Sequence, residues 1–427
     1  MTISQHFDTN QFVTQETLPS IFANLNLISD GSKKTSILNH FFRNQFFKLL
    51  NRIDNGFITL HDTIGSNTFG DNDSELKCEI TIYDLSSYSK IALGGSNGSA
   101  QAYIEGLWSS DNPTSLIRIL VRNRDILNEM ESGLSTISQS ALKIWHSFNR
   151  NTKQGSKKNI AAHYDLGNSF FKLFLDQRMM YSSALYQTGD DLNSASQRKL
   201  KRICDKLQIT NKDHVIEIGS GWGGFACYAA KTTGCKITTV TISQEQYSEA
   251  VKQVKQQKLE HLVSVKLQDY REIKGTYDKL VSIEMIEAVG HQYLDSYFNK
   301  INHLLKPDGK AMIQAIVIDD AHYQRALKEV DFIKRYIFPG SFIPCYKVIS
   351  ETANQNKLNI TEVFDMGLSY AQTLRDWRKL FYQNLDQMKA QGFDANFLRM
   401  WEFYLCYCEG GFDEHAISVG QITFTKA

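Results

Sequence analysis

From about residue 161 onward, short apolar runs alternate with amphipathic segments along the chain. The runs with the length of buried strands are "HVIEIG" (214–219), "CKITTVTIS" (235–243), "VSVKLQDY" (263–270), "YDKLVSIEM" (277–285) and "GKAMIQAIVI" (309–318). The segments "GGFACYAAKTTG" (223–234) and "QEQYSEAVKQVKQQK" (244–258), which follow the first and the second of these runs, have the apolar spacing of helices. Such alternation is typical of parallel βαβ units. We therefore predict an α/β fold with a doubly wound sheet, which binds its ligand at the carboxyl ends of the strands.

The first 149 residues follow a different pattern, which predicts a smaller α+β domain. Helical apolar spacing covers 41–53, and alternating apolar and polar positions predict strands over 56–62 and 75–84. Residues 99–127 predict two helices with a break near "SSDNP". Residues 150–160 are polar and basic without apolar periodicity, so we interpret them as a linker between domains 1–149 and 161–427.

Composition narrows the class of protein without identifying it. The chain has 427 residues, 42% hydrophobic and 22% charged, with a formal net charge of +1. This is an ordinary globular balance and gives no sign of a nucleic-acid binder. Its seven cysteines are scattered without metal-ligand spacing, and the N-terminus lacks an apolar signal region. We expect a reduced, cytoplasmic setting, no metal, and at most peripheral membrane contact, because no apolar run approaches the length of a bilayer span.

A glycine-rich loop, "EIGSGWGG" (217–224), joins the first predicted strand of the sheet to a helix. Its glycines fit G-x-G-x-x-G, a pattern that allows a sharp turn and close approach of a ligand. A nicotinamide dinucleotide and S-adenosylmethionine compete for such a loop. Glu217 before the first glycine and Asp269 after the third strand favour S-adenosylmethionine, because they offer carboxylates to its ammonium and adenine amino groups. The second strand lacks a ribose-binding acid at its tip, although Glu245 lies close enough to weaken that argument.

Longer motifs resemble the cyclopropane-fatty-acyl-phospholipid synthases over nearly the whole chain. They are "HYDLGNSFFKLFLDQRMMYSSALY" (163–186), "LVSIEMIEAVG" (280–290), "RYIFPGSFIP" (335–344), "YLCYCEGGF" (404–412) and, in the first domain, "ALGGSNGSAQAYIEGLW" (92–108). The resemblance implies a Rossmann-like methyltransferase sheet that uses S-adenosylmethionine. It further implies that the enzyme transfers a methyl group to the cis double bond of an unsaturated phospholipid acyl chain and closes a cyclopropane ring. The reaction would take place at the inner face of the membrane. The N-terminal domain would present lipid or form a homodimer contact.

The resemblance also carries site residues over to this sequence. In the family a bound bicarbonate is thought to remove the proton that closes the ring. Its ligands would here be the Ser183 backbone, Glu287, Gln314, the Ile316 backbone and Tyr370. Cofactor contacts are expected from Tyr181, Ser182, Glu217, Gly219, Gly221, Gly223, Thr241, Ser243, Gln246, Asp269, Tyr270 and Arg271, with Asp269 added from its position after the third strand.

Two of these positions depart from the family pattern. Ser183 stands where a cysteine is common, and Gln314 stands where a histidine is common. A glutamine amide donates a hydrogen bond to an anion but cannot become a cation. The departures leave the product open: loss of a different proton would give a methylene branch, and later reduction a methyl branch. A lipid-binding relative with impaired catalysis and a small-molecule methyltransferase are further alternatives.

Structural roles compete with several of the candidate catalytic residues. Glu287 would also suit the start of a helix, where a carboxylate is favourable, and Tyr370 would suit an ordinary core position. Cys408 matches a cysteine once treated as catalytic in relatives. It falls on an apolar helix face with Trp401 and Leu405, which predicts a buried and inert thiol.

Overall fold

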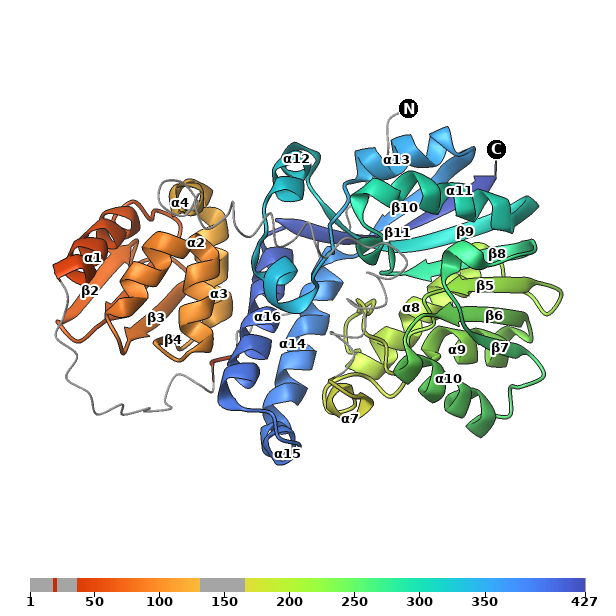
Figure 1. The fold of residues 1–427 in the computed structure, drawn as a ribbon, viewed down its shortest axis with the longest axis horizontal. Helices are drawn as coiled ribbons and strands as arrows, with labels where there is room; N and C mark the ends of the chain where they lie inside the picture. Colours follow the sequence, from red (N-terminus) through yellow and green to blue (C-terminus); the bar gives the residue numbers. More distant parts are fainter. Residues whose placement is uncertain (1–17, 21–36, 131–165, 427) are drawn as a thin grey trace.

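The computed structural model describes residues 18–20, 37–130 and 166–426. Within these residues the chain forms a small four-stranded sheet and a larger seven-stranded sheet. The predicted linker, 150–160, lies outside the described residues. In Figure 1 the smaller sheet and its helices lie at one end, the larger sheet lies at the other, and two long helices, α14 (Gly367–Gln383) and α16 (Ala395–Asp413), stand between them.

The N-terminal module has the strand order β2-β1-β3-β4, with β1 parallel to β3 and the other pairs antiparallel. Its strands are β1 (Phe57–His61), β2 (Ser66–Gly70), β3 (Lys77–Ile82) and β4 (Trp108–Ser110), and its helices are α1 (Ile37–Leu50), α2 (Ser86–Ile104), α3 (Pro113–Arg122) and α4 (Arg124–Met130). The predicted helix over 41–53 and the strands over 56–62 and 75–84 are confirmed. The break between the two helices of 99–127 is also present, and it contains the short strand β4.

The larger sheet has the order β10-β11-β9-β8-β5-β6-β7. Its strands are β5 (His214–Ile218), β6 (Lys236–Thr241), β7 (Val263–Leu267), β8 (Tyr277–Ile283), β9 (Leu305–Ile318), β10 (Leu358–Asp365) and β11 (Ile417–Lys426). Strands β5 to β9 pair in parallel, and β11 is antiparallel to β9 and β10. The predicted doubly wound α/β sheet is confirmed. The chain runs outward from β5 through β6 and β7 and then returns to the other side of β5 as β8, which places the topological switch point between β5 and β8.

Helices cover both faces of this sheet because successive side chains of each strand point to opposite sides. Val215 packs in one hydrophobic cluster and its neighbour Ile216 in the other. The remaining helices, in chain order, are α7 (Asn168–Phe171), α8 (Leu192–Leu207), α9 (Gly224–Thr233), α10 (Gln244–Gln256), η1 (Tyr270–Glu272), η2 (Ile286–Ala288), η3 (His291–Tyr293), α11 (Leu294–Leu304), α12 (Asp320–Lys328), η4 (Ile333–Ile337), α13 (Tyr346–Gln355) and α15 (Leu385–Ala390).

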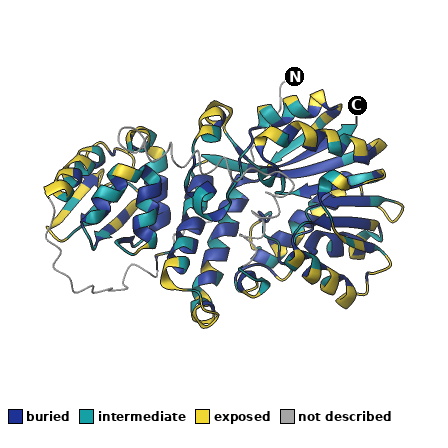
Figure 2. Cartoon of the chain, viewed as in Figure 1, coloured by how far each residue is buried: buried dark blue, intermediate teal, exposed yellow. Residues whose placement is uncertain are grey.

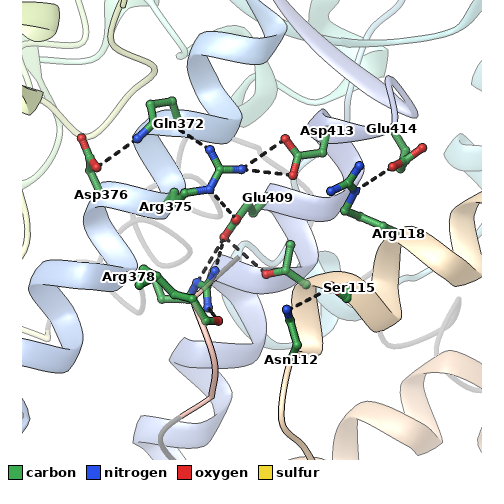
Figure 3. Close-up of polar contacts among 12 residues, drawn as sticks. Asn112, Ser115, Arg118, Gln372, Arg375, Asp376, Arg378, Glu409, Asp413 and Glu414 are labelled. Carbon is green, nitrogen blue, oxygen red and sulfur yellow. Dashed lines mark hydrogen bonds and ion pairs between the residues drawn. The ribbon is translucent and has the colours of Figure 1, made fainter. Parts of the chain in front are cut away.

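Helix α16 is buried on most of its sides, as Figure 2 shows. A helix with apolar residues all round belongs inside a protein, and here the N-terminal module covers one side of it while α14 covers another. Buried polar groups join the three parts. Arg378 of α14 forms an ion pair with Glu409 of α16 at 2.9 Å (Figure 3). Thr114 of α3 donates to the same carboxylate. The site described next therefore rests on a continuous packed body.

Candidate active site

The glycine loop lies at the switch point, directly after β5. Gly219, Gly221 and Gly223 have φ angles of 93°, 48° and 91°, in the region that favours glycine. The backbone N–H groups of Gly219 and Ser220 both donate to the Val240 carbonyl, at 3.0 and 2.9 Å, which ties the loop to β6. No heavy atom lies within 4 Å of the place where a Cβ on Gly221 would stand. The loop therefore offers open backbone to a ligand, as the prediction of a cofactor loop requires.

Further predicted cofactor residues follow β6 and β7, the next strands along the same sheet edge. Thr241 ends β6 and donates from its hydroxyl to Gln246 Oε1 at 2.8 Å. Ser243 caps α10 by accepting from the Gln246 N–H at 3.2 Å. These contacts hold a short polar loop beside the glycine loop.

Asp269, Tyr270 and Arg271 form the turn after β7. The Asp269 carboxylate accepts from the Arg271 guanidinium, with Nε at 2.8 Å and Nη2 at 2.6 Å. Tyr270 is half-buried and packs edge-on against Tyr297, with ring centroids 5.7 Å apart. The turn is thus rigid. The adenine contact of Asp269 stays a prediction, and Arg271 is the group that fixes where that carboxylate points.

Glu217 lies inside β5, two residues before the first loop glycine. Its side chain is 2% exposed and accepts a hydrogen bond from the Thr239 hydroxyl at 2.5 Å. Burial raises the pKa of this carboxyl to about 8, although the Thr239 hydrogen bond opposes the shift. Two residues before Gly219, Glu217 suits the predicted role of meeting a cationic ligand group, whose charge would favour its ionised form.

The predicted cofactor pair, Tyr181 and Ser182, approaches from the segment between α7 and α8. The Tyr181 hydroxyl donates to the Tyr404 hydroxyl at 3.0 Å, and its ring packs against Trp377. Ser182 Oγ accepts from Lys199 Nζ at 2.6 Å. Lys199, a fully buried side chain of α8, escaped the sequence analysis. Burial lowers the pKa of its ammonium to about 8, against the opposing charges of Glu284 and Asp176.

Three of the residues predicted to bind an anion converge on Glu284, another residue that the sequence analysis missed. Glu284 Oε1 accepts from the Ser183 backbone N–H at 2.9 Å and from Gln314 Nε2 at 2.7 Å. Glu284 Oε2 accepts from the Tyr370 hydroxyl at 2.7 Å. The only available signal was a second acid in "SIEMIEAVG", three residues before Glu287 and directly after β8, where the resemblance assigned no role.

The donors around Glu284 are deeply buried, with Ser183 0%, Gln314 1% and Tyr370 6% exposed. Burial raises the pKa of the Glu284 carboxyl, while Lys199, Gln314, Tyr370 and Ser183 each oppose that shift. Burial and the adjacent Glu284 raise the pKa of Tyr370 well above its ordinary value. Tyr370 is therefore a neutral phenol, and its O–H donates a hydrogen bond to the Glu284 carboxylate.

Glu287 lies beside this cluster with a different partner. Its Oε1 accepts from the Ile316 backbone N–H at 2.6 Å. Within the part of the chain that the structure describes, Oε2 is buried and has no hydrogen-bond partner. Burial, followed by the charge of Glu284, raises the pKa of Glu287 to about 8. Most Glu287 carboxyls are thus protonated at neutral pH, with one oxygen left for a ligand.

The expected bicarbonate site is therefore corrected. Its predicted residues do come together, but Glu284 accepts the hydrogen bonds of Ser183, Gln314 and Tyr370, and Glu287 accepts that of Ile316. The donors are satisfied by carboxylates of the chain itself, so bicarbonate does not fit this arrangement. S-adenosylmethionine does fit its expected site, because the open glycine loop and the polar turns after β6 and β7 share one sheet edge.

Cys408 lies in α16, and burial raises the pKa of its thiol far above the ordinary value. A thiol held in its neutral form is a poor nucleophile. Cys408 is half-buried, less than the sequence predicts, but the raised pKa agrees with an inert thiol and gives no support for a catalytic role.

The glycine loop and the carboxylate pair are neighbours across the switch point. The Cγ of Met285, which lies between Glu284 and Glu287 in the chain, is 3.2 Å from the place where a Cβ on Gly219 would stand. A side chain other than glycine at position 219 would therefore press on the segment that carries both acids. The close approach brings the expected cofactor loop and the acid cluster into one site.

Comparison with known proteins finds relatives that are named as cyclopropane synthases or fatty acid methyltransferases. Residues 151–422 match the family model of mycolic acid cyclopropane synthetase. The tuberculostearic acid methyltransferase UfaA1 of Mycobacterium tuberculosis is 35% identical over 347 residues, which cover 79% of this chain and 80% of the relative. The cyclopropane-fatty-acyl-phospholipid synthase of Escherichia coli K12 is 31% identical over 351 residues, which cover 82% of this chain and 88% of the relative.

Solved structures with the same fold include two cyclopropane synthases. The cyclopropane synthase MmaA2 from Mycobacterium tuberculosis aligns with a TM-score of 0.60 and 25% identity over 63% of this chain and 98% of its own. The mycolic acid cyclopropane synthase CmaA1, complexed with SAH and CTAB, aligns with a TM-score of 0.59 and 28% identity over 63% of this chain and 98% of its own. These alignments confirm the methyltransferase fold.

Proposed function

Because the chain belongs to the mycolic acid cyclopropane synthetase family and is an S-adenosylmethionine-dependent methyltransferase, we propose that its acceptor is the cis double bond of an unsaturated phospholipid acyl chain. S-adenosylmethionine supplies an electrophilic methyl on a sulfonium. The proposed product is a cyclopropane fatty acid, formed in place on the lipid.

One observation carries the proposal: the open glycine loop touches the segment that bears Glu284 and Glu287. The contact between Gly219 and Met285 places the expected binding loop of the methyl donor next to the segment with the two acids, at the switch point of the sheet. Cyclopropane formation needs both, because an alkene that accepts a methyl group becomes a carbocation and must then lose a proton. Methyl transfer to an amine or a hydroxyl forms no carbocation, so an enzyme for that reaction does not need such a group of acids.

Aromatic rings beside the acids suit an apolar substrate that reacts through a cationic intermediate. Trp377 lies between Tyr181 and Tyr370, with centroid separations of 5.3 and 6.2 Å. Phe338 extends the group toward Tyr181 and Tyr404, at 6.3 and 6.2 Å. Aromatic faces attract cations, more strongly when water is excluded, and they also pack against acyl chains. These rings therefore favour an alkene substrate over a polar one.

A methylene- or methyl-branched product is the second candidate. The chain resembles both a methyltransferase named for tuberculostearic acid and a cyclopropane synthase over about four-fifths of its length. The methyl-transfer step is shared by both products. They differ only in how the carbocation then rearranges and loses a proton.

The proposal places the enzyme at a membrane surface, peripheral on the inner face, because its acyl substrate lies in a bilayer. Among helices in residues 37–130 and 166–426, none is both long and apolar enough to cross a membrane. We assign the N-terminal module to lipid presentation or to a homodimer contact. Flotation of the full chain with vesicles, compared with its mass in solution by light scattering, separates these two roles.

The test of the proposed function is methyl transfer to defined vesicles. The full chain is incubated with S-adenosylmethionine labelled in its methyl group and with phospholipids that differ only in one cis double bond. Label in the fatty acids of the unsaturated lipid alone supports the proposal. Label in the headgroup, or equal labelling of saturated lipid, would exclude the double bond as acceptor.

A further inference from the structure

We propose that Glu284 is a built-in base, whose carboxylate takes the place of a bound anion and removes the proton that completes the reaction. This inference rests on the proposed function, because it assigns the proton acceptor for the same carbocation. Its support comes from the hydrogen bonds, the backbone and the surroundings of Glu284.

Hydrogen-bond donors from three distant parts of the chain converge on the Glu284 carboxylate. They are the backbone N–H of Ser183, the amide of Gln314 and the phenol of Tyr370. Such convergence stabilises a negative charge, and charged hydrogen bonds of this kind are stronger than neutral ones. These are also the groups that the family resemblance assigns to an external anion. In this chain the Glu284 carboxylate, which is part of the protein, takes the place of that free anion.

The Gln314 amide is oriented toward Glu284 by a second layer of hydrogen bonds. Its Oε1 accepts from Gln421 Nε2 at 3.1 Å, and Gln421 Oε1 in turn accepts from Arg202 Nη1 at 2.6 Å. The NH₂ of Gln314 is therefore the end that faces Glu284. A relay of aligned dipoles leads from the Arg202 cation to the Glu284 carboxylate, which polarises each hydrogen bond in the same sense.

The backbone of Glu284 is strained. Its φ is 47°, in the left-handed region that side chains other than glycine rarely adopt. A glycine would hold this turn at less cost. Strain of this kind persists where the surrounding structure holds the residue in place and is concentrated at functional sites. The backbone conformation at position 284 thus favours glycine, and a residue with a carboxylate occupies it instead.

Glu284 has more groups that stabilise a negative charge than Glu287 has. Burial raises the pKa of both carboxyls, but three hydrogen-bond donors and the nearby Lys199 ammonium oppose that shift at Glu284, whereas Glu287 has one donor and a pKa raised to about 8. Although its donors are buried, Glu284 itself remains partly exposed. An anionic, partly accessible carboxylate beside a protonated neighbour is the state that accepts a proton from a substrate.

Atoms and electrons balance in the proposed step. The π electrons of the double bond form a C–C bond to the methyl group, the C–S bond breaks toward sulfur, and the adjacent lipid carbon becomes the carbocation. Glu284 takes a proton from the new methyl group, and the released C–H electrons close the ring onto the carbocation. For the branched product, a hydride first shifts between the two former alkene carbons, and loss of a methyl proton to Glu284 then forms the methylene group.

The experiment compares the full chain with Glu284→Gln and Glu284→Gly in buffer depleted of carbon dioxide, with and without added bicarbonate. We expect the unsubstituted protein to make product at the same rate in both buffers. Glu284→Gln keeps the shape but lacks the base, and we expect a loss of at least about 100-fold that bicarbonate does not restore. Glu284→Gly frees the Ser183, Gln314 and Tyr370 donors, so bicarbonate should restore at least about a tenth of the original rate.

Glu402→Gln is the matched control. Glu402 is also a fully buried carboxylate that accepts from tyrosine hydroxyls, those of Tyr103 and Tyr382, but it faces the N-terminal module. This variant should lower the melting temperature without creating any response to bicarbonate. Calorimetric binding of S-adenosylhomocysteine should stay within about threefold in every Glu284 variant, because the donor loop is unchanged.

Binding of ¹³C-labelled bicarbonate, followed by NMR, tests the inference without any need for activity. We expect binding to Glu284→Gly and none to the unsubstituted protein. Bicarbonate binding to the unsubstituted protein, a bicarbonate requirement in its turnover, or full activity of Glu284→Gln would each overturn the inference while leaving methyl transfer to lipid intact. If the protein binds no bicarbonate but labels no unsaturated lipid, the proposed function fails, and Glu284 has no reaction to serve.

Discussion

Glu284 combines two features at one residue: a carboxylate that accepts hydrogen bonds from buried donors and a backbone in the left-handed region. The backbone makes its own prediction, separate from catalysis. Replacement by glycine removes both the carboxylate and the Cβ strain, whereas replacement by alanine removes the carboxylate and keeps the strain.

We therefore expect Glu284→Gly to be more stable than Glu284→Ala by about 1 kcal/mol, the reverse of the usual order for these two residues. Urea unfolding of both variants measures the difference. Equal stabilities, or greater stability of the alanine variant, would show that the turn after β8 is not strained.

Glu287 and Cys408 differ in what their side chains offer to a substrate. Glu287 has one oxygen without a partner beside Glu284, whereas the Cys408 thiol has a raised pKa. Glu287→Gln still accepts from the Ile316 N–H, so the strand should hold, but it replaces the oxygen that Oε2 offers to a ligand, and kcat should fall about tenfold. Cys408→Ser should stay within about threefold of the original kcat. The opposite order of losses in the vesicle assay would contradict the assignment of the site.

Glu217 predicts a dependence of stability on pH. Its pKa rises from the ordinary 4.5 to about 8 in the folded chain, so the native state keeps a proton that the unfolded state releases above 4.5. Stability therefore falls as pH rises between these values, by up to about 1.4 kcal/mol per pH unit for this group. Melting temperatures of Glu217→Gln should fall less between pH 5 and 8, whereas Glu351→Gln, an exposed control, should behave like the original chain. Parallel curves for all three proteins would refute this role of Glu217.

At the level of single residues, the family resemblance predicted that Ser183, Gln314, Ile316 and Tyr370 lie together. The structure brings the first two and Tyr370 to Glu284, and Ile316 to Glu287. Glu284 and Lys199 were missed for a physical reason. The partner of each lies far away in the sequence, as with Glu284 and Tyr370 or Lys199 and Ser182, and no local pattern reports such a contact. The direction of the Gln314 amide depends on Gln421, which lies on the antiparallel strand β11.

At the level of elements, short apolar runs predicted β5 to β9, and helical apolar spacing predicted α9 and α10. These patterns did not predict β2, a polar strand, "SNTFG", whose place is set by pairing with β1. Nor did they predict β4, which has only three residues and closes the edge of the small sheet against β3. Pairing between strands decides such segments, and their composition alone does not.

The α14–α16 pair depends on a buried ion pair, which Figure 3 shows with its neighbours. Arg378 and Glu409 have side chains that are both 0% exposed. Glu409→Gln would leave the Arg378 charge uncompensated, and we expect a loss of about 3–5 kcal/mol of stability in urea unfolding. Asp386→Asn, which breaks the exposed pair with Lys389, is the control and should leave stability unchanged. A loss no larger than that of the control would mean that the pair contributes little to holding the two helices.

Across the whole molecule, α16 connects the N-terminal module to the reaction site. Glu402 on this helix accepts from Tyr103 of the module, and two residues later Tyr404 accepts from Tyr181 beside the cofactor loop. One hydrophobic cluster runs through the module, α16 and the segment around Phe171. The proposed lipid contact of the module would therefore be linked to the site by packed side chains of this cluster.

The fate of one methyl group is the most direct test of the proposed chemistry. S-adenosylmethionine with a fully deuterated methyl is given to the full chain and to vesicles of a cis-monounsaturated phospholipid, and the fatty acids are then examined by mass spectrometry and proton NMR. We predict an acyl chain that keeps two of the three deuterium atoms, because the third leaves as the proton taken by Glu284, with the ring visible by NMR. An acyl chain that keeps all three, or label found only outside the acyl chain, would contradict this chemistry.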